Sequence, residues 1–244
     1  MQSAISQKDP PRAIILAAGQ GSRLMPITKD IPKCLVPIAG RSFLERALGA
    51  LLKSGIPKIE IITGVHADKV EQFVERHFPD APIDCLFNPR HSTHNNFVSL
   101  QIALEKNRQS FLLMDGDLLF DSALLDLLLK HPTPNAMVVD SGKAFTPEAM
   151  KAVCDEENKI EKLGKNFSAD ISHGEYIGLA KFSDRWAGAL AAVEAEPAWY
   201  YEDAIRSLIP TQEAIATVET GGLFWAEVDT REDLDQLSLA MAPE

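Results

Sequence analysis

Cysteine is scarce in this chain, and no long apolar run is present. The three cysteines, Cys34, Cys85 and Cys154, are scattered, odd in number and without CxxC spacing. The sequence therefore indicates neither a disulfide framework nor a zinc site. No stretch reaches the roughly 20 apolar residues that a membrane-spanning helix needs, and the first dozen residues lack the apolar segment of a secretory signal. We expect a cytoplasmic protein with no membrane partner.

Basic residues are in deficit: 24 Lys and Arg stand against 35 Asp and Glu, which gives a formal net charge of -11. The electrostatic field of such a chain repels a polyanion, which argues against a nucleic-acid partner. Nucleotides are not excluded, because a small anion responds to a local cluster of N–H groups and cations. The expected partners are small molecules, and a homodimer stays open.

Both common nucleotide-binding glycine signatures are missing. The stretch IILAAGQGSRL contains no GxxxxGK[ST], and Leu24 stands where a dinucleotide-binding GxGxxG needs its third glycine. What is present is an apolar strand that runs into Gly19 and Gly21 and is followed by Arg23 and Lys33. Glycines let backbone N–H groups approach phosphate oxygens. On the residues alone, this stretch is either a different phosphate-binding loop or an ordinary strand-to-helix turn.

Short apolar strands alternate with amphipathic helices along the first 130 residues or so, which is typical of α/β proteins. After the strand before Gly19, the pattern predicts helices near 43–52, 70–74, 97–105 and 122–130 and strands at 58–63, 83–87 and 110–114. The later pattern is irregular, with strands near 136–139, 160–163, 176–182, 214–218 and 223–228 and helices near 183–195, 199–208 and 231–240. We expect a doubly wound, mostly parallel sheet with an antiparallel extension, as a single domain over 13–244 after an N-terminal tail at 1–12.

Three aspartates follow predicted strands. Asp115 and Asp117 come after the apolar run FLLM, and Asp229 follows LFWAEV. Open α/β sheets bind ligands at the carboxyl ends of their strands, and a pair of carboxylates there suits Mg²⁺. Two of the three aspartates also have a simpler explanation. Asp229 is a candidate N-cap for the last helix, and Asp115 is a candidate hydrogen-bonding partner of the site rather than a direct ligand.

A loop rich in Asn and Ser leads into the helix near 97–105. Asn88, Asn95, Asn96 and Ser99 offer both donors and acceptors, as the reading of a base edge and a ribose requires. The alternative is a capped turn with Asn95 or Asn96 as the N-cap.

The last third of the chain offers candidate contacts to a second substrate. Lys165 is a candidate contact to the phosphate of the substrate. Glu175 is a candidate contact to a hydroxyl or an ammonium group. Tyr201 and Glu202 lie in WYYED, where aromatic rings beside carboxylates can hold a cation such as choline or a primary amine. The alternatives are a solvated lysine and a helix start whose aromatic residues pack in the core.

The strings LAAGQGSRL and IPKCLVPIAGRSFLERAL resemble the signature of the nucleotidyltransferases that activate sugar phosphates and phosphocholine. The resemblance implies a Rossmann-like nucleotidyltransferase fold with Arg23 on the triphosphate, Lys33 on the substrate phosphate or the transition state, and Mg²⁺ on Asp117 and Asp229. It also implies that the nucleotide is wrapped by a loop comprising Leu16, Ala17, Ala18, Gly19 and Gly21.

The pattern N-x(6)-N-N-x-x-S-L from Asn88 is more similar to the phosphocholine and 2-aminoethylphosphonate cytidylyltransferases than to the sugar-phosphate enzymes. Leu163 and Gly164 follow Glu-Lys where the sugar enzymes usually carry proline. The resemblance thus implies Mg²⁺-dependent transfer of CMP from CTP to phosphocholine or 2-aminoethylphosphonate, with release of pyrophosphate. Three alternatives stay open: a sugar-1-phosphate nucleotidyltransferase, a glycosyltransferase that uses Asp115-Gly116-Asp117 as its D-x-D motif, and a non-catalytic nucleotide-binding regulator.

Overall fold

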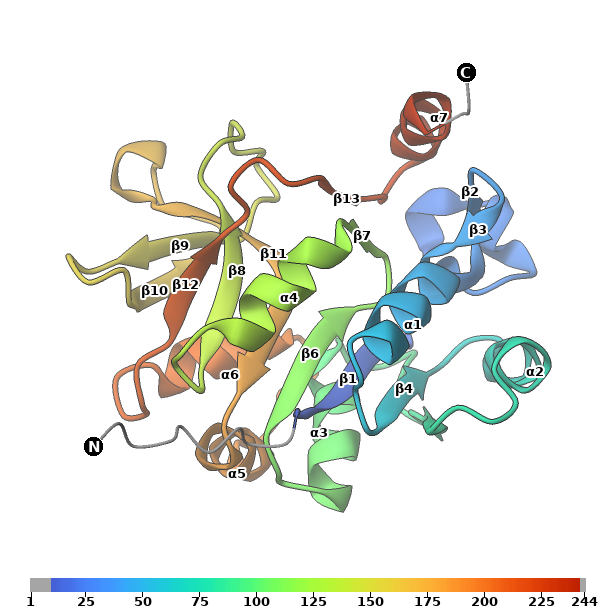
Figure 1. Cartoon of the computed structure of the whole chain (residues 1–244), viewed down its shortest axis with the longest axis horizontal. Coiled ribbons are helices and arrows are strands. Elements are labelled where there is room, and N and C mark those ends of the chain that lie inside the picture. The colour runs from blue at the N-terminus through green and yellow to red at the C-terminus, as the bar shows by residue number, and fades with distance from the viewer. Residues whose placement is uncertain (1–9, 242–244) are drawn as a thin grey trace, which may run out of the picture.

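A nine-stranded mixed sheet runs through the molecule (Figure 1). The computed structural model describes residues 10–241. One half of the sheet is parallel and consists of β1 (Arg12–Ala17), β4 (Ile59–Thr63), β5 (Ile83–Phe87) and β6 (Phe111–Asp115). β1 pairs with both β4 and β6 and is buried along its whole length. This explains its uninterrupted apolar sequence, which is typical of a strand covered on both faces.

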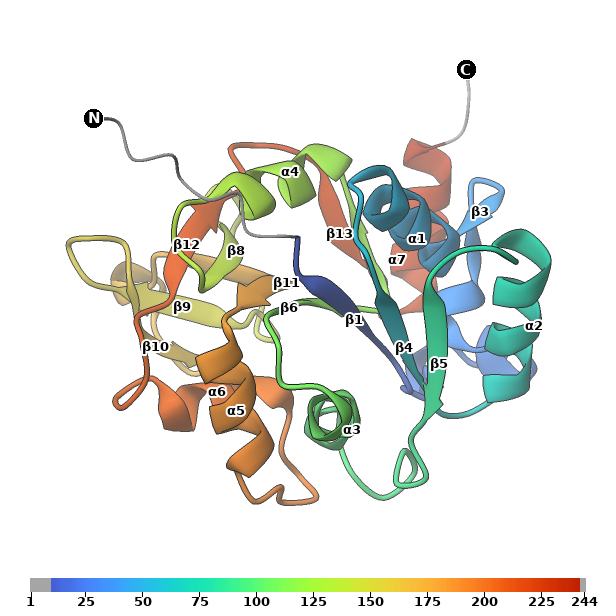
Figure 2. The same ribbon diagram turned by 60° about the horizontal axis from the view of Figure 1, so that its bottom comes forward.

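Helices cover both faces of the sheet and create two separate cores (Figure 2). One face carries α1 (Phe43–Lys53), α2 (Ala67–His77) and α4 (Ser122–Lys130). The other carries α3 (Phe97–Lys106), α5 (Asp184–Ala192) and α6 (Tyr201–Leu208). Alternate residues of β1 enter opposite cores: Ile15 packs on the first face and Ile14 on the second.

The second half of the sheet is the predicted antiparallel extension. Its central strand, β11, pairs antiparallel with β6, β8 and β9. The strands of this half are β8 (Ala136–Asp140), β9 (Lys151–Cys154), β10 (Ile160–Gly164), β11 (Gly174–Phe182) and β12 (Ala216–Glu219). The α/β class with an antiparallel extension is therefore confirmed.

The elements that the sequence pattern missed are all short. They are β2 (Pro37–Ile38), β3 (Arg41–Ser42), β7 (Leu118–Phe120), β9, and the 3-10 turns η1 (Ser22–Leu24), η2 (Ile27–Lys29), η3 (Lys33–Leu35) and η4 (Ala169–Ile171). Segments of two to four residues are too short for a hydrophobic period to register.

The N-terminal boundary of the fold differs slightly from the sequence expectation. β1 begins at Arg12, inside the expected tail, and the buried guanidinium of Arg12 pairs with Glu60 of β4. Residues 1–9 of that tail lie outside the described residues. Within residues 10–241, no helix has the length and apolar character needed to cross a bilayer.

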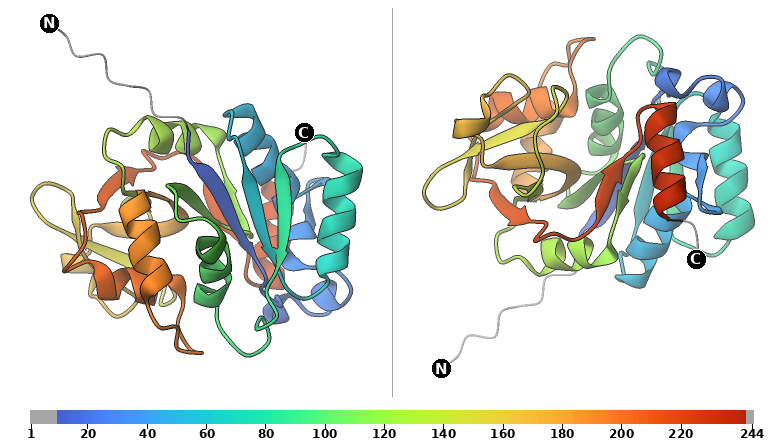
Figure 3. Two further views of the ribbon diagram at one scale, coloured as in Figure 1. Left: turned by 90° about the horizontal axis from the view of Figure 1, so that it is seen from below. Right: turned by 90° about the horizontal axis from the view of Figure 1, so that it is seen from above.

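The last elements return to the beginning of the chain. β13 (Trp225–Glu227) pairs antiparallel with β7, and α7 (Arg231–Ala240) packs near β2 (Figure 3). Leu234 and Leu237 of α7 share a third apolar cluster with Leu24 and Val36. This packing brings the residues between β13 and α7 to the glycine loop that follows β1.

Candidate active site

The glycine loop and the Asp115-Gly116-Asp117 segment lie side by side because β1 and β6 are parallel neighbours. Leu16 stands opposite Asp115 in the strand register, so both strands deliver their following residues to one edge of the sheet. Gly116 donates its N–H to the carbonyl oxygen of Leu16 over 3.0 Å. A Cβ on Gly116 would lie 2.6 Å from that oxygen, so this close approach requires glycine.

The two glycines of the loop serve different purposes. Gly21 adopts φ 60, and its carbonyl oxygen accepts a hydrogen bond from the hydroxyl of Thr28 over 2.7 Å. A side chain at Gly21 would be strained and would crowd Thr28. A Cβ on Gly19 would meet no protein atom within 4 Å. Gly21 therefore shapes the turn, whereas the backbone at Gly19 faces open space.

Asp229 reaches the same place through the β7–β13 pair. Glu227, at the end of β13, stands opposite Leu118 at the start of β7, so Asp229 and Asp117 lie just beyond the paired residues. Thr230 is the N-cap of α7, and its hydroxyl accepts the N–H of Asp233 in a capping box. The alternative of Asp229 as the N-cap is therefore wrong, and its carboxylate is available to the site.

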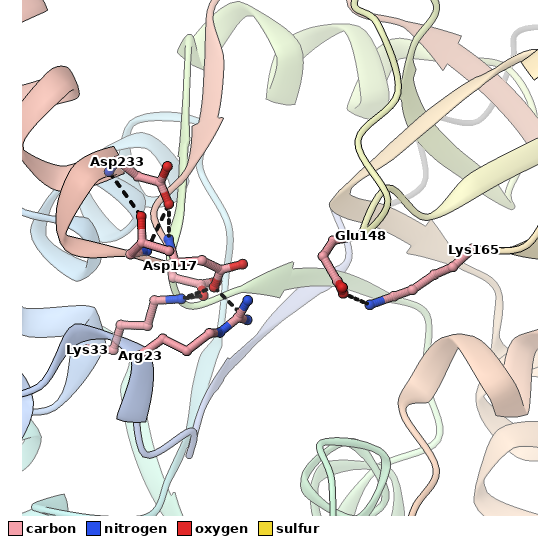
Figure 4. A network of polar contacts seen from close by, with 8 residues as sticks. Arg23, Lys33, Asp117, Glu148, Lys165 and Asp233 are labelled. Atoms are coloured by element: carbon pink, nitrogen blue, oxygen red, sulfur yellow. Dashed lines mark hydrogen bonds and ion pairs between the residues drawn. The ribbon is translucent and has the colours of Figure 1, made fainter.

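Lys33 lies at the centre of the charged cluster (Figure 4). Its Nζ donates to Asp117 and, over 2.8 Å, to Oδ1 of Asp229. Nη2 of Arg23 lies 3.0 Å from the same Oδ1. Burial by itself would lower the pKa of Lys33, whose side chain is only 14% exposed, but Asp117 and Asp229 outweigh that effect and raise the pKa. Lys33 is thus a permanent cation held between two carboxylates.

These side chains open onto a cavity of about 510 Å³, a size suited to a nucleotide-scale ligand. Most of the predicted site residues line it: Leu16, Ala17, Ala18, Gly19, Arg23, Lys33, Asn96, Ser99, Asp115, Asp117, Lys165, Glu175, Glu202 and Asp229. Four predicted residues do not line it: Gly21, Asn88, Asn95 and Tyr201.

The asparagines bind other parts of the chain. Asn88 donates its side-chain N–H to the hydroxyl of Ser99 over 2.9 Å. Asn95 donates to the carbonyl oxygen of Ala198 over 2.7 Å, and Oδ1 of Asn96 accepts the N–H of Tyr201 over 2.9 Å. Asn96 is the N-cap residue of α3, but its side chain does not cap that helix. The loop therefore ties α3 to the start of α6 and fixes the wall of the cavity.

Tyr201 corrects one expectation from the sequence. Its side chain is buried in the core at 0% exposure, because α6 packs on the apolar face of the sheet, and the ring cannot contact a substrate in the cavity. Its hydroxyl donates to Oδ2 of Asp115 over 2.9 Å. Tyr200, which is 48% exposed, lines the cavity instead.

Asp115 is half-buried in a tightly packed environment. Gly178 of β11 has φ 81, and a Cβ there would lie 2.5 Å from Oδ2 of Asp115. Burial raises the pKa of Asp115 well above its ordinary value, and the neighbouring Glu202 adds to the shift. Asp115 therefore belongs to the wall of the cavity and is held there by the buried Tyr201, which fits the supporting role considered for it.

Lys165 stands on the opposite wall of the cavity from Lys33 (Figure 4). Its Nζ donates to Oε2 of Glu148 over 2.8 Å, and that hydrogen bond raises the pKa of Lys165. Glu148 precedes β9 in a segment where the sequence shows no periodic pattern.

Eight lining residues were not predicted: Cys34, Gly116, Glu148, Met150, Tyr176, Gly178, Tyr200 and Glu227. Glu227 had a usable signal. It lies two residues before Asp229, and residues two apart along an extended segment share a face. Glu227 is exposed to the cavity, yet desolvation there raises its pKa to about 8, and the nearby Asp117 and Asp229 add to the shift. Glu148 had no such signal.

Comparisons with known proteins bear on this site. The chain is 28% identical over 92% of its length to the bifunctional IPC transferase and DIPP synthase of Aquifex aeolicus and 27% identical over 96% to the CMP-5'-(3-aminopropyl)phosphonate synthase of Streptomyces rubellomurinus. It spans 50% and 39% of those two proteins. It is also 27% identical, over 91% of its length, to the CTP:phosphoglutamine cytidylyltransferase of Campylobacter jejuni and spans 97% of that protein.

Solved structures share the fold. The inositol-1-phosphate CTP transferase of T. maritima superposes with a TM-score of 0.79 at 18% identity, covering 96% of this chain and 98% of the other. The CTP:phosphocholine cytidylyltransferase of Streptococcus pneumoniae gives 0.76 at 20% identity, with 95% and 99% covered. These likenesses confirm the nucleotidyltransferase fold.

The profile of the MobA-like NTP transferase domain matches residues 13–217, which include the glycine loop, Lys33 and Asp117. Asp229 and α7 follow the matched segment. The resemblance seen in the sequence is thereby confirmed, and the chain belongs to the MobA-like NTP transferase family.

Proposed function

We propose that the protein is a Mg²⁺-dependent cytidylyltransferase that transfers CMP from CTP to phosphocholine or 2-aminoethylphosphonate and releases pyrophosphate. The observation that carries the proposal is the contact of Lys33 Nζ with both Asp117 and Asp229 beside the glycine loop. A cation and two carboxylates at one point can serve a phosphoryl-type transfer, in which catalysis depends on alignment and charge neutralisation.

The donor set at Asp117 and Asp229 fits Mg²⁺. Two carboxylates converge on one point, and Mg²⁺ in nucleotide sites usually takes one or two carboxylates together with substrate phosphates and water. Within residues 10–241, no cluster of three or more His, Cys, Asp or Glu suggests a metal site made of protein ligands alone. When bound, Mg²⁺ would neutralise charge on the nucleotide phosphates.

The chain's own residues would act on the two phosphate groups. An oxygen of the acceptor phosphate or phosphonate attacks the α-phosphorus of CTP, and the bond to the pyrophosphate oxygen breaks. Lys33 would stabilise the negative charge on the pentavalent phosphorus, and Arg23 would hold the departing pyrophosphate. Lys165 would release Glu148, to which it is hydrogen-bonded in this structure, and bind the acceptor phosphate instead. No covalent nucleophile is needed.

The relatives favour CTP as the nucleotide, and the cavity offers polar groups for a base and a ribose. Relatives that match over nearly the whole chain carry CMP or CTP in their names, and one of them is a phosphonate cytidylylating enzyme. Asn96 and Ser99 line the cavity next to the glycine loop, and both can hydrogen-bond to a base or a ribose. Gly19 leaves its side of the cavity open for the triphosphate.

The test is pyrophosphate release by the purified protein with Mg²⁺. CTP, UTP and ATP are compared as donors, and 2-aminoethylphosphonate, phosphocholine, inositol 1-phosphate and glucose 1-phosphate as acceptors. We expect release with CTP and an amine-bearing acceptor, and none when Mg²⁺ is removed by a chelator. Release only with a sugar phosphate would assign the protein to the sugar-activating branch, and no release with any pair would overturn the proposal.

A further inference from the structure

We infer that the acceptor carries an ammonium group with N–H bonds, and that Glu202 accepts a hydrogen bond from it. The inference rests on the proposed function for the phosphate end of the acceptor. It goes further in one respect: it separates a primary amine from the quaternary ammonium of phosphocholine. Charge, hydrogen bonding and the placement of aromatic rings support it independently.

The first argument is the charge of the cavity wall. The three basic side chains in the wall are all paired, Arg23 and Lys33 with Asp229 and Lys165 with Glu148. The wall also contains the carboxyl groups of Glu175 and Glu202, which form no ion pair within the described chain. Asp115 and Glu227 are left out of this surplus, because their raised pKa values favour the neutral form. A wall with this surplus attracts a cationic ligand and disfavours an acceptor that carries only phosphate and hydroxyl groups.

The second argument is an unsatisfied acceptor atom. Oε2 of Glu202 is buried and has no hydrogen-bond partner among residues 10–241, although the side chain lines the cavity. Buried polar atoms in folded proteins are nearly always paired, so a missing partner points to a ligand. For the ionised carboxylate, which can only accept, that partner must be a donor. An ammonium with N–H bonds provides one, whereas a trimethylammonium group has no N–H bond to give.

The third argument is the placement of the tyrosines. Quaternary ammonium groups are recognised by cages of several exposed aromatic faces. Here Tyr201 is fully buried, and Tyr176 is 4% exposed. Their rings meet edge-to-face, 6.3 Å apart, and their hydroxyls lie 3.2 Å apart. Tyr200 alone among the three tyrosines offers an exposed face to the cavity. One ring does not form a cage, so the carboxylates are the main recognition groups.

Glu202 also has a suitable position. It follows Tyr201 at the start of α6, and its charge acts on Lys165 and Asp115, its neighbours in the cavity wall. Burial raises the pKa of Glu202 to about 7. An ammonium ion beside it would favour the ionised carboxylate. The phosphate of a short acceptor at Lys165 and its amine at Glu202 would therefore occupy adjacent parts of one wall.

The experiment uses acceptors that differ only at nitrogen. Phosphoethanolamine, its N-methyl and N,N-dimethyl derivatives and phosphocholine share the phosphate and the spacer but lose N–H bonds one at a time. With Mg²⁺ and CTP, we expect kcat/KM to fall along the series by about tenfold or more, because each methyl removes a donor. Glu202→Gln should remove most of this preference by selectively weakening the use of phosphoethanolamine. Equal or better use of phosphocholine by the natural protein would overturn the inference.

Glu194→Gln is the matched control, because it removes the same charge from an exposed position before α6 and outside the cavity. It should keep the full preference. A Glu202→Gln variant that also keeps it would overturn the role of Glu202. An unchanged KM for CTP in Glu202→Gln shows that the nucleotide site of that variant is intact.

The inference and the proposed function can fail separately. If pyrophosphate is released from CTP only with inositol 1-phosphate or glucose 1-phosphate, CTP remains the donor, but the inference that the acceptor carries an ammonium group is overturned. If no pair reacts, the proposed function fails, and calorimetric binding of the same four amines to the protein with Mg²⁺ still decides the inference. Tighter binding of phosphoethanolamine than of phosphocholine would support it, and equal or reversed affinities would overturn it.

Discussion

Lys33 and Asp229 are separated by 196 positions in the sequence, yet Nζ of Lys33 lies 2.8 Å from Oδ1 of Asp229. The contact forms because β13 pairs with β7 and α7 packs near β2, which returns the end of the chain to the glycine loop. Asp117 contacts the same Nζ from the end of β6. Three distant segments thus create one charged centre. Removing these charged side chains from water costs free energy, and that cost is offset only while both the cation and the carboxylates are present.

Lys33→Ala should reduce kcat by about a hundredfold or more, because it removes the cation nearest the reacting phosphorus. The fold should persist, although Asp117 and Asp229 lose their shared cation, since Lys33 lies in the short η3 turn and belongs to none of the three apolar clusters. Steady-state pyrophosphate release and circular dichroism check the two parts. Arg41→Ala is a suitable control, because it removes an exposed cation whose ion pair is with Glu45, away from the cavity. Full activity in a folded Lys33→Ala protein would refute the assignment.

Asp115→Asn and Asp117→Asn should behave differently although the two residues are neighbours. Burial raises the pKa of Asp115 and so favours its neutral form, for which an amide is a close replacement. We expect Asp115→Asn to keep kcat within about tenfold, and Asp117→Asn to lose about a hundredfold or more, because Lys33 and the metal both use that carboxylate. Equal losses in the two variants would show that Asp115 acts as a charged group.

The stability of the protein should depend on Glu202 as the pH changes. The pKa of Glu202 is about 7 in the folded state, against an ordinary value of 4.5. Between these values the folded protein binds the proton more tightly than the unfolded chain, so the contribution to stability is present below pH 4.5 and is lost as the pH rises to about 7.

Chemical denaturation at pH 5 and pH 8 tests this dependence. Glu202→Gln should reduce the loss of unfolding free energy between the two pH values by about 1 kcal/mol, discounted for partial solvent exposure. Asp115, Asp203 and Lys165 also act on this carboxyl and stay in place in the variant. An unchanged pH dependence would place Glu202 in a more hydrated environment.

Gly178→Ala should destabilise the protein by about 2 kcal/mol or more, because residue 178 has φ 81 and the new Cβ would meet Oδ2 of Asp115. Gly188→Ala is the matched control. Gly188 lies within α5, its Cβ would meet no atom within 4 Å, and alanine there should stabilise the helix by up to about 1 kcal/mol. Denaturation midpoints of both variants check the prediction, which fails if both substitutions are neutral.

Local patterns in the sequence predicted most of the fold. The spacing of Leu44, Ala47 and Leu48 gave α1, and the apolar runs at β4 and β6 gave their strands, because periods of 3.6 and 2 residues are imposed by the helix and the strand themselves. β9 and the 3-10 turns were missed, since segments so short carry no period. Their conformation depends on the strands and helices that they contact.

The sequence by itself determined the glycine loop, the positions of Lys33, Asp117 and Asp229, and the resemblance to nucleotidyltransferases, because each depends on residues close together in the chain. Only the tertiary structure decided that Thr230 rather than Asp229 caps α7, that Tyr201 reaches Asp115 across 86 positions while Tyr200 faces the cavity, and that Glu148 and Glu227 complete the wall. The physical reason is that glycine turns and strand ends can be recognised locally, whereas the choice between adjacent capping residues and the direction of a side chain depend on the packing of α6, α7 and β13 against elements remote in sequence.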